Sequence, residues 1–199
     1  MKKKKEFFDQ LADSWEDQSF PPETRKRVSE LVVAFGIKKG ARVLDVGTGT
    51  CILHPYLLEA VGKSGQVFAF DYSFKMLKEA TQKPSKLNLF CFQASAMAVP
   101  LPNNLFDYII CFAAFPHFDN KFKALQEMAR VAKIGAEVFI AHLMSRNELI
   151  KHHGSHSPVA GDTVPVEMDM RRMYKSAGLT DPQITDKPGL YLARTLKPK

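Results

Sequence analysis

The chain has 199 residues, of which 45% are hydrophobic and 25% are charged, and its formal net charge is +7. These values are typical of a globular protein of one domain with a buried core. No apolar run approaches the roughly 20 residues that a membrane-spanning helix needs, and no apolar signal segment follows the basic N-terminus. We therefore expect a cytoplasmic protein with no membrane association.

Neither the positive charge nor the cysteines indicate a particular partner. Residues 2–5 supply four of the seven net charges, and a lysine-rich leader is usually a solvated, frayed tail. No aromatic residues alternate with a basic stripe, as they would in a protein that binds single-stranded nucleic acid. The odd set Cys51, Cys91 and Cys111 lies in or beside apolar segments, which indicates reduced and mostly buried thiols.

Hydrophobic periodicity predicts alternating helices and strands through most of the chain. Two helices are expected first, over residues 6–17 and 22–35. Strands then follow at 43–46, 66–70, 88–92, 106–112 and 135–142, with helices at 52–61, from 73 onward and at 121–132. Such alternation predicts a parallel sheet with right-handed crossovers.

The last third of the chain is less regular. A capping box from Ser145 to Glu148 predicts the start of a short helix, and residues 152–165 are polar and contain two glycines, as in a loop. A helix over 166–177 and two strands at 182–186 and 190–196 follow. The predicted fold is a doubly wound α/β domain: a mostly parallel seven-stranded sheet with helices on both faces and an antiparallel C-terminal strand pair.

The loop after the first predicted strand is the main candidate for ligand binding. Gly47 and Gly49 allow a sharp turn and the close approach of a ligand, whereas a plain turn would need only one glycine. Ile52 stands where a dinucleotide site needs a small residue, and no Gly-Lys-Ser/Thr sequence forms a phosphate-binding loop. Asp45 suits a cationic ligand, and Asp71 ends the second strand where such folds bind ribose hydroxyls.

Five segments resemble the motifs of the class I S-adenosylmethionine-dependent methyltransferases, small-molecule type. They are residues 43–50, 70–77, 94–100, 104–107 and 130–135. Residues 7–9 with Trp15 resemble the N-terminal lid of the small-molecule members. The resemblance implies one methyltransferase domain over 1–199, with a helical lid at 1–36, a cofactor-binding core at 41–142 and C-terminal helices and strands at 143–199.

The resemblance also implies the cofactor S-adenosylmethionine, which would leave as S-adenosylhomocysteine after an in-line methyl transfer. Asp45 would lie near the ammonium, Asp71 at the ribose and Ser95 at adenine. The family usually has glycine in place of Cys51 and often aspartate in place of Ser95, so we expect weaker discrimination of adenine. The full set of expected cofactor-binding residues is Asp45, Gly47, Thr48, Gly49, Cys51, Asp71, Tyr72, Met76, Ser95, Ala96, Cys111 and Phe112.

The acceptor is expected to bind beside the loop that follows the fourth strand. His117 is a candidate general base, and it is equally a candidate for simple packing on an aromatic neighbour. Aromatic faces favour a sulfonium as well as an apolar acceptor. The residues expected to line this pocket are Trp15, Phe115, Phe118 and His142.

A second group of histidines suggests a metal site without establishing one. His142, His152, His153 and His156 fall within 15 residues, and imidazole is a common metal ligand. No carboxylate or cysteine accompanies them at a fixed spacing, so we assign no metal.

Three functions remain open from the sequence. The first is an enzyme that methylates a small-molecule acceptor without nucleic acid or membrane. The second is an RNA or protein methyltransferase. The loop after the fourth strand lacks an Asn-Pro-Pro-Tyr-like motif, which argues against the nucleic-acid version. The third is a non-catalytic sensor or partner subunit that binds the cofactor, which Cys51 and Ser95 keep open.

Overall fold

A seven-stranded sheet forms the centre of the computed structural model, which describes residues 2–81, 87–154 and 158–199. The strand order is β3-β2-β1-β4-β5-β7-β6, with β1 to β5 parallel and β7 antiparallel to both neighbours. This arrangement confirms the predicted fold class. The strands are β1 Arg42–Val46, β2 Gln66–Asp71, β3 Leu89–Gln93, β4 Phe106–Phe112, β5 Ala132–His142, β6 Gln183–Lys187 and β7 Leu190–Leu196.

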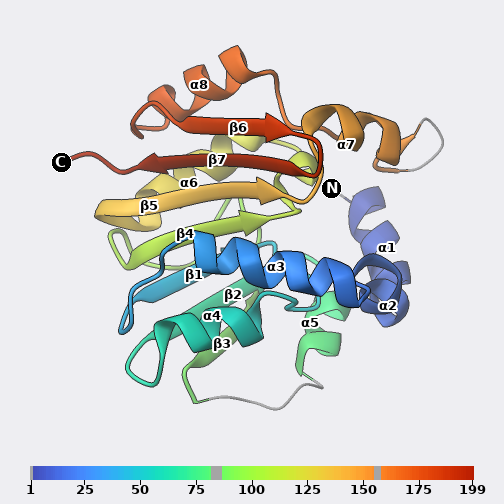
Figure 1. Ribbon diagram of the computed structural model, residues 1–199, viewed down its shortest axis with the longest axis horizontal. Coiled ribbons are helices and arrows are strands. Elements are labelled where there is room, and N and C mark those ends of the chain that lie inside the picture. Colours follow the sequence, from blue (N-terminus) through green and yellow to red (C-terminus); the bar gives the residue numbers. More distant parts are fainter. Residues whose placement is uncertain (1, 82–86, 155–157) are drawn as a thin grey trace.

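Helices cover both faces of the sheet, and a further group lies at the end where the parallel strands terminate. α3 and α4 lie on one face and α6 on the other, while α1 and α2 lie beyond the strand ends (Figure 1). No helix of the described ranges is long and apolar enough to cross a bilayer. The helices are α1 Lys2–Leu11, α2 Trp15–Ser19, α3 Pro22–Ala34, α4 His54–Val61, α5 Phe74–Thr81, α6 Lys121–Val131, α7 Arg146–His153 and α8 Glu167–Ser176, with 3₁₀ turns at Ala12–Ser14 and Phe115–His117.

The core forms as two apolar layers, because successive side chains of a strand point to opposite faces. On one face Val43 and Val67 pack with Leu57 of α4. On the other face Leu44 packs in the same layer as Leu125 of α6. All five of these aliphatic side chains are fully buried. The sheet is therefore fixed between its helices, and the strand ends are held in place.

Local signals in the sequence set several helix ends as predicted. The Ser73 hydroxyl accepts a hydrogen bond from the Met76 amide at 3.1 Å and so caps α5. Ser145 and Glu148 form the complete capping box at the start of α7. Pro55 lies in the first turn of α4, where a missing amide proton costs little.

The N-terminal lysines are not a frayed tail, and this expectation was wrong. They belong to α1, and the predicted single helix over 6–17 is instead α1, a 3₁₀ turn and α2. The ammonium of Lys4 lies 2.7 Å from Asp162 and 3.5 Å from Asp119, and Lys5 pairs with Asp9 at 2.5 Å. Two of these acidic partners are more than 100 residues away in the sequence, which is why composition alone did not reveal them.

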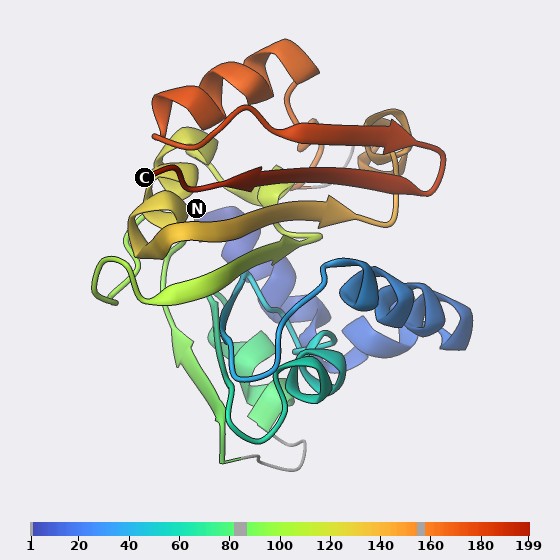
Figure 2. The ribbon, with the colours of Figure 1, turned by 60° about the vertical axis from the view of Figure 1, so that its left-hand side comes forward.

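The cysteines are mostly buried, as expected, with one exception. Cys51 and Cys111 are buried, whereas Cys91 is exposed. Cys91 belongs to β3, which is the outermost strand at one edge of the sheet, opposite β6 (Figure 2). An edge strand is covered less completely than a central one, so an apolar sequence there does not ensure burial.

Candidate active site

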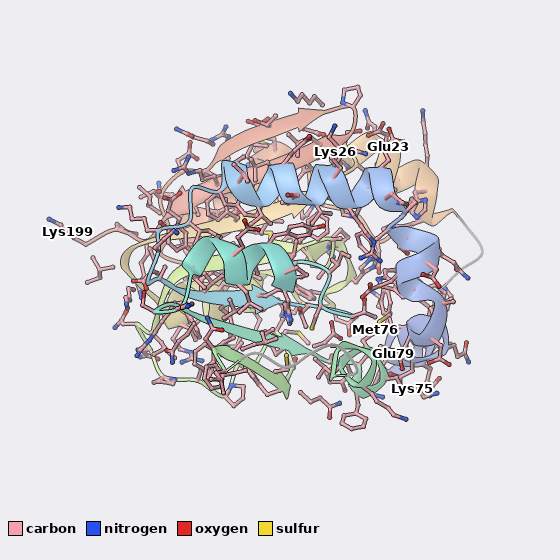
Figure 3. All side chains as sticks on the ribbon, turned by 60° about the horizontal axis from the view of Figure 1, so that its bottom comes forward. Glu23, Lys26, Lys75, Met76, Glu79 and Lys199 are labelled. Atoms are coloured by element: carbon pink, nitrogen blue, oxygen red, sulfur yellow. The ribbon has the colours of Figure 1, made fainter. Side chains whose placement is uncertain are left out.

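A pocket opens at the carboxyl ends of β1, β2 and β4, beneath α1 and α2. Its empty volume is about 1100 Å³, open solvent at the mouth included. Met76 lies on α5, next to the N-terminal helices (Figure 3). The wall contains thirteen of the residues expected from the sequence: Trp15, Asp45, Gly47, Thr48, Gly49, Asp71, Tyr72, Met76, Ser95, Ala96, Phe112, His117 and Phe118.

The glycine loop after β1 requires its two glycines. Gly47 has φ of 72° and Gly49 has φ of 55°, a region that L side chains rarely adopt. A Cβ atom on Gly47 would lie only 2.5 Å from the Cβ of Ala114. The Gly47 and Thr48 amides both donate to the carbonyl of Phe70 at 3.0 Å, which fixes the turn close to β2.

Cys51 continues this left-handed backbone although it has a side chain. Its φ is 69°, a value that costs a non-glycine residue about 1 kcal/mol. The thiol is fully buried and lies 3.4 Å from the Thr48 hydroxyl. The backbone angle thus accounts for the glycine that the family usually has here, and Cys51 lies behind the loop rather than in the pocket wall.

Asp45 occupies a buried polar position at the base of the loop. It accepts a hydrogen bond from the Thr48 hydroxyl at 2.5 Å, and that hydroxyl lies 3.0 Å from Nε2 of His54. Burial raises the pKa of Asp45 to about 7, because a charged carboxylate is poorly solvated inside the protein. A cation bound in the pocket would favour the ionised form.

Asp71 joins the two loops that form the pocket floor. Its two carboxylate oxygens accept hydrogen bonds from the amides of Gly49 at 2.9 Å and Ser73 at 2.8 Å. Burial raises the pKa of this carboxyl as well. Each carboxylate oxygen has two lone pairs, so both oxygens can still accept from ligand hydroxyls.

Ser95 lies at the opposite wall of the pocket, next to Ala96. Its hydroxyl accepts a hydrogen bond from the Met97 amide at 3.2 Å and retains a proton to donate. The neighbouring Tyr72 is more than one-third exposed. This wall therefore offers one uncharged polar group and apolar surface to a planar ligand.

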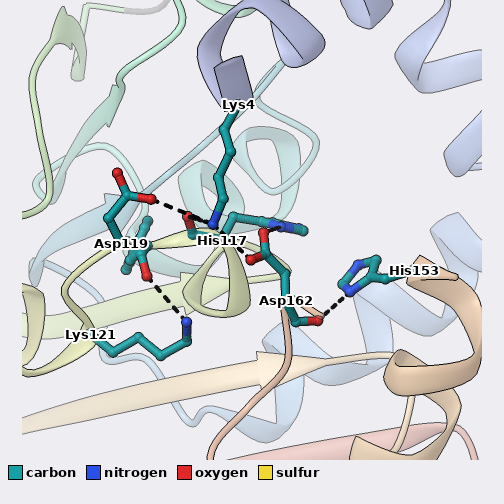
Figure 4. A network of polar contacts seen from close by, with 7 residues as sticks. Lys4, His117, Asp119, Lys121, His153 and Asp162 are labelled. Carbon is teal, nitrogen blue, oxygen red and sulfur yellow. Dashed lines mark hydrogen bonds and ion pairs between the residues drawn. The ribbon is translucent and has the colours of Figure 1, made fainter. Parts of the chain in front are cut away.

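His117 belongs to a polar network that joins three distant segments. Its Nδ1 lies 2.9 Å from Asp162 Oδ2, while Lys4 donates to Asp162 Oδ1 and, at 3.2 Å, to the His117 carbonyl (Figure 4). His153 Nδ1 contacts the Asp162 carbonyl oxygen. Because the Asp162 carboxylate can only accept, Nδ1 of His117 carries the proton and Nε2 is left as the acceptor nitrogen.

Burial and ion pairing act on this network in opposite directions. Burial lowers the pKa of His117, although the hydrogen bond to Asp162 acts against this. Burial works to raise the pKa of Asp162, but the hydrogen bonds from His117 and Lys4 keep it below its ordinary value. The result is a neutral imidazole beside an ionised carboxylate at neutral pH.

Four expected residues do not line the pocket. Cys111 and Phe115 are in the apolar layer that also contains Leu44. His142 is half-buried, its Nδ1 atom is buried and unpaired among the described residues, and burial lowers its pKa to about 3. Its ring centroid lies 6.5 Å from that of Phe112. Cys51 is the fourth.

Three of the four histidines in the expected group, His142, His152 and His153, lie in the described ranges. His153 bonds to Asp162 and its ring centroid lies 5.0 Å from that of His117. The ring of His152 is tilted against that of His153, with the centroids 5.7 Å apart. His156 lies outside the described residues.

Several wall residues carried no clear signal in the sequence. Lys4, Phe8 and Phe20 reach the pocket from the N-terminal segment, and the motif at residues 7–9 was the only indication of this. Asp162, which holds His117, lies in a polar loop 45 residues away. Nothing in the local sequence separates it from an ordinary loop aspartate.

A doubly wound sheet with a glycine loop and two acidic strand ends defines a nucleotide-type ligand site at the strand termini. The methyltransferase domain family matches residues 44–140. A crystal structure of an S-adenosylmethionine-dependent methyltransferase from Aquifex aeolicus is 26% identical, with a TM-score of 0.70 over 97% of this chain and 98% of that one. These matches support a class I S-adenosylmethionine-dependent methyltransferase.

Two curated relatives indicate which branch of the family is similar. The demethylmenaquinone methyltransferase of Anoxybacillus flavithermus is 30% identical over 137 residues, which are 66% of this chain and 58% of that protein. The ubiquinone/menaquinone biosynthesis C-methyltransferase of Pseudoalteromonas translucida is 33% identical over 115 residues, or 56% and 46% of the two chains. The chain thus matches about half of each relative's length.

Proposed function

We propose that this protein transfers a methyl group from S-adenosylmethionine to a small apolar acceptor that carries an acidic hydroxyl, with a demethylated hydroquinone as the first acceptor to test. The observation that supports this proposal most directly is the position of His117. Its neutral imidazole lies in the wall of an aromatic pocket, with Nδ1 at 2.9 Å from Asp162 Oδ2. The names of the two quinone-related relatives support the choice of acceptor.

The cofactor would occupy the part of the pocket between the glycine loop and α5. The missing Cβ of Gly47 lets the loop pack against Ala114, the missing Cβ of Gly49 leaves room for the methionine end of the cofactor, and Asp45 would face its ammonium. Asp71 would accept from the ribose hydroxyls, with Ser95 at adenine. When bound, S-adenosylmethionine supplies an activated methyl group on a sulfonium.

The chain's own residues would position the acceptor and exclude water. Phe8, Trp15, Phe112 and Phe118 give the pocket an aromatic wall, which suits a planar apolar molecule and a neighbouring cation. We infer an in-line transfer, in which holding the two reactants in contact provides most of the rate. The helices α1 and α2 would act as the lid.

His117 would take the proton of the acceptor hydroxyl on Nε2 as the methyl group is transferred. A neutral imidazole is the form that can accept a proton, and burial keeps His117 in that form. Asp162 would stabilise the imidazolium that results. For a hydroquinone, loss of this proton would make the ring carbon nucleophilic. After the new carbon–carbon bond forms, that carbon would lose its proton and the oxygen would regain one from His117, so each turnover releases one proton.

Incubation with S-adenosylmethionine and a reduced, demethylated naphthoquinone tests this proposal. We expect S-adenosylhomocysteine to form together with a methylated hydroquinone that is heavier than the substrate by one methylene group, and His117→Asn to slow the reaction by about 100-fold. Cofactor binding without transfer to any hydroquinone would favour the sensor instead, and an RNA or protein acceptor would overturn the choice of substrate.

A further inference from the structure

Three metal-ligating side chains meet on the far side of the cofactor loop, outside the pocket wall. One ligand atom each from Cys51, His54 and Cys91 lies within 4.8 Å of the other two. It is the one such group of three or more found among the described residues. The three residues come from separate parts of the chain: the loop after β1, the first residue of α4 and the middle of β3.

The sheet register explains why these residues meet. Asp45, Ala69 and Cys91 occupy one row across β1, β2 and β3, so their side chains share the face that α4 covers. The small side chain of Ala69 between them leaves space above the sheet. Cys51 from the loop after β1 and His54 from α4 bring their ligand atoms to within 4.8 Å of that of Cys91.

The donor set suits a tetrahedral, thiophilic metal ion. Two thiolates and an imidazole are ligands that Zn²⁺ prefers. With metal–sulfur bonds of about 2.3 Å, two sulfurs of a tetrahedral site lie roughly 3.8 Å apart. The ligand atoms lie within 4.8 Å of one another, so they need to approach by only about 1 Å to reach this spacing. A disulfide would need the two sulfurs at about 2.05 Å.

Access also favours the site. Cys91 is exposed and gives an ion a path from solvent, while Cys51 and His54 are buried. An ion could therefore reach the exposed thiol first and the two buried ligands after it.

The surrounding residues already orient the cluster. The Thr48 hydroxyl lies 3.0 Å from His54 Nε2 and 3.4 Å from Cys51 Sγ, and it donates to Asp45 at 2.5 Å. Hydrogen bonding to groups beyond the ligands is characteristic of metal sites. An ion held here would connect the cofactor loop to the outer strand β3.

We propose that Cys51, His54 and Cys91 bind one Zn²⁺ ion, with water as the fourth ligand, and that this ion fixes the loop that follows β1. The sequence predicted no metal because the two cysteines are 40 residues apart and show none of the usual short spacing. This site is independent of the methyl acceptor proposed above.

Metal-free protein without a tag tests the site by Zn²⁺ titration against a chromophoric chelator and by Co²⁺ substitution. We expect one Zn²⁺ per chain, a rise in Tm on binding and a sulfur-to-cobalt charge-transfer band. Cys91→Ser should weaken Zn²⁺ binding by about 100-fold or more, since a ligand is lost. Because Cys91 is exposed, this variant should remain folded.

Two matched variants make the result specific. Cys111→Ser removes a thiol that lies in the other apolar layer, and His152→Asn removes an exposed histidine. Both should keep the stoichiometry, the affinity and the cobalt band. The proposal is overturned if Cys91→Ser binds Zn²⁺ as tightly as the unaltered chain, if Co²⁺ gives no sulfur band, or if His152→Asn alone abolishes binding.

Discussion

The imidazole of His117 is held by the carboxylate of Asp162, with 2.9 Å between Nδ1 and Oδ2. Lys4, from the first helix, binds the same carboxylate at 2.7 Å. A single aspartate thus connects the N-terminal helix, the turn after β4 and the loop before α8. Its position ties the N-terminal helix to the imidazole of the candidate base.

Replacement of Asp162 by Asn should lower kcat by about 10- to 100-fold, because the amide can keep the hydrogen bond but cannot stabilise an imidazolium. The carboxylate raises the pKa of His117, so its loss should move the acidic limb of the kcat profile to lower pH. Asp119→Asn is the matched control, since Asp119 also pairs with Lys4. An unmoved acidic limb in Asp162→Asn would limit Asp162 to a structural role.

Gly47→Ala should abolish cofactor binding and destabilise the fold by more than the strain of its positive φ alone. Gly135 provides the comparison, because it has φ of 78° with no atom within 4 Å of a built Cβ. Gly135→Ala should cost about 1 kcal/mol of unfolding free energy, and Gly47→Ala more, because its Cβ meets Ala114. Urea unfolding measures both. Equal costs would show that the contact with Ala114 is unimportant.

At Cys51, a Gly variant should be more stable than an Ala variant, contrary to the usual order. Both substitutions remove the buried thiol, but only Gly removes the strain of φ 69°, worth about 1 kcal/mol. Thermal unfolding of the two metal-free variants gives the difference. Greater stability of Cys51→Ala would mean that the loop changes its backbone angle when the thiol is lost.

The stability of the ligand-free protein should fall as the pH rises from about 4 to about 7 through the titration of Asp45. The pKa of Asp45 is about 7 in the folded protein and about 3.9 in an unfolded chain, so the folded state binds the proton more tightly over this range. The contribution is on the order of 2–4 kcal/mol. Asp45→Asn should remove this part of the dependence in urea unfolding at several pH values.

Residues with a local role were predictable from the sequence, and residues with a distant partner were not. The strands, the glycine turn and the caps at Ser73 and Ser145 all depend on a few neighbouring residues. By contrast, Asp162 acquires its role only when the loop before α8 folds against His117. The meeting of Cys51 with Cys91 likewise depends on the register between β2 and β3.

Trp15 and Phe115 show the same limit within the predicted pocket. Both were expected in its wall because of their aromatic character and their place near a family motif. Trp15 lines the pocket, whereas Phe115 turns into the apolar layer beneath it. Phe115 begins the 3₁₀ turn at Phe115–His117 and is buried, whereas Phe118, directly after that turn, lines the pocket. Hydrophobicity alone does not reveal which of the two faces the ligand.

Calorimetric titration of the purified protein with S-adenosylmethionine and S-adenosylhomocysteine tests the central claim most directly. One site per chain should bind both molecules, with affinity for S-adenosylmethionine that rises from pH 6 to pH 8 as Asp45 ionises. NAD should not bind, because Ile52 stands where a dinucleotide site needs a small residue. Binding of NAD, or no heat with either S-adenosyl compound at millimolar concentration, would contradict the account.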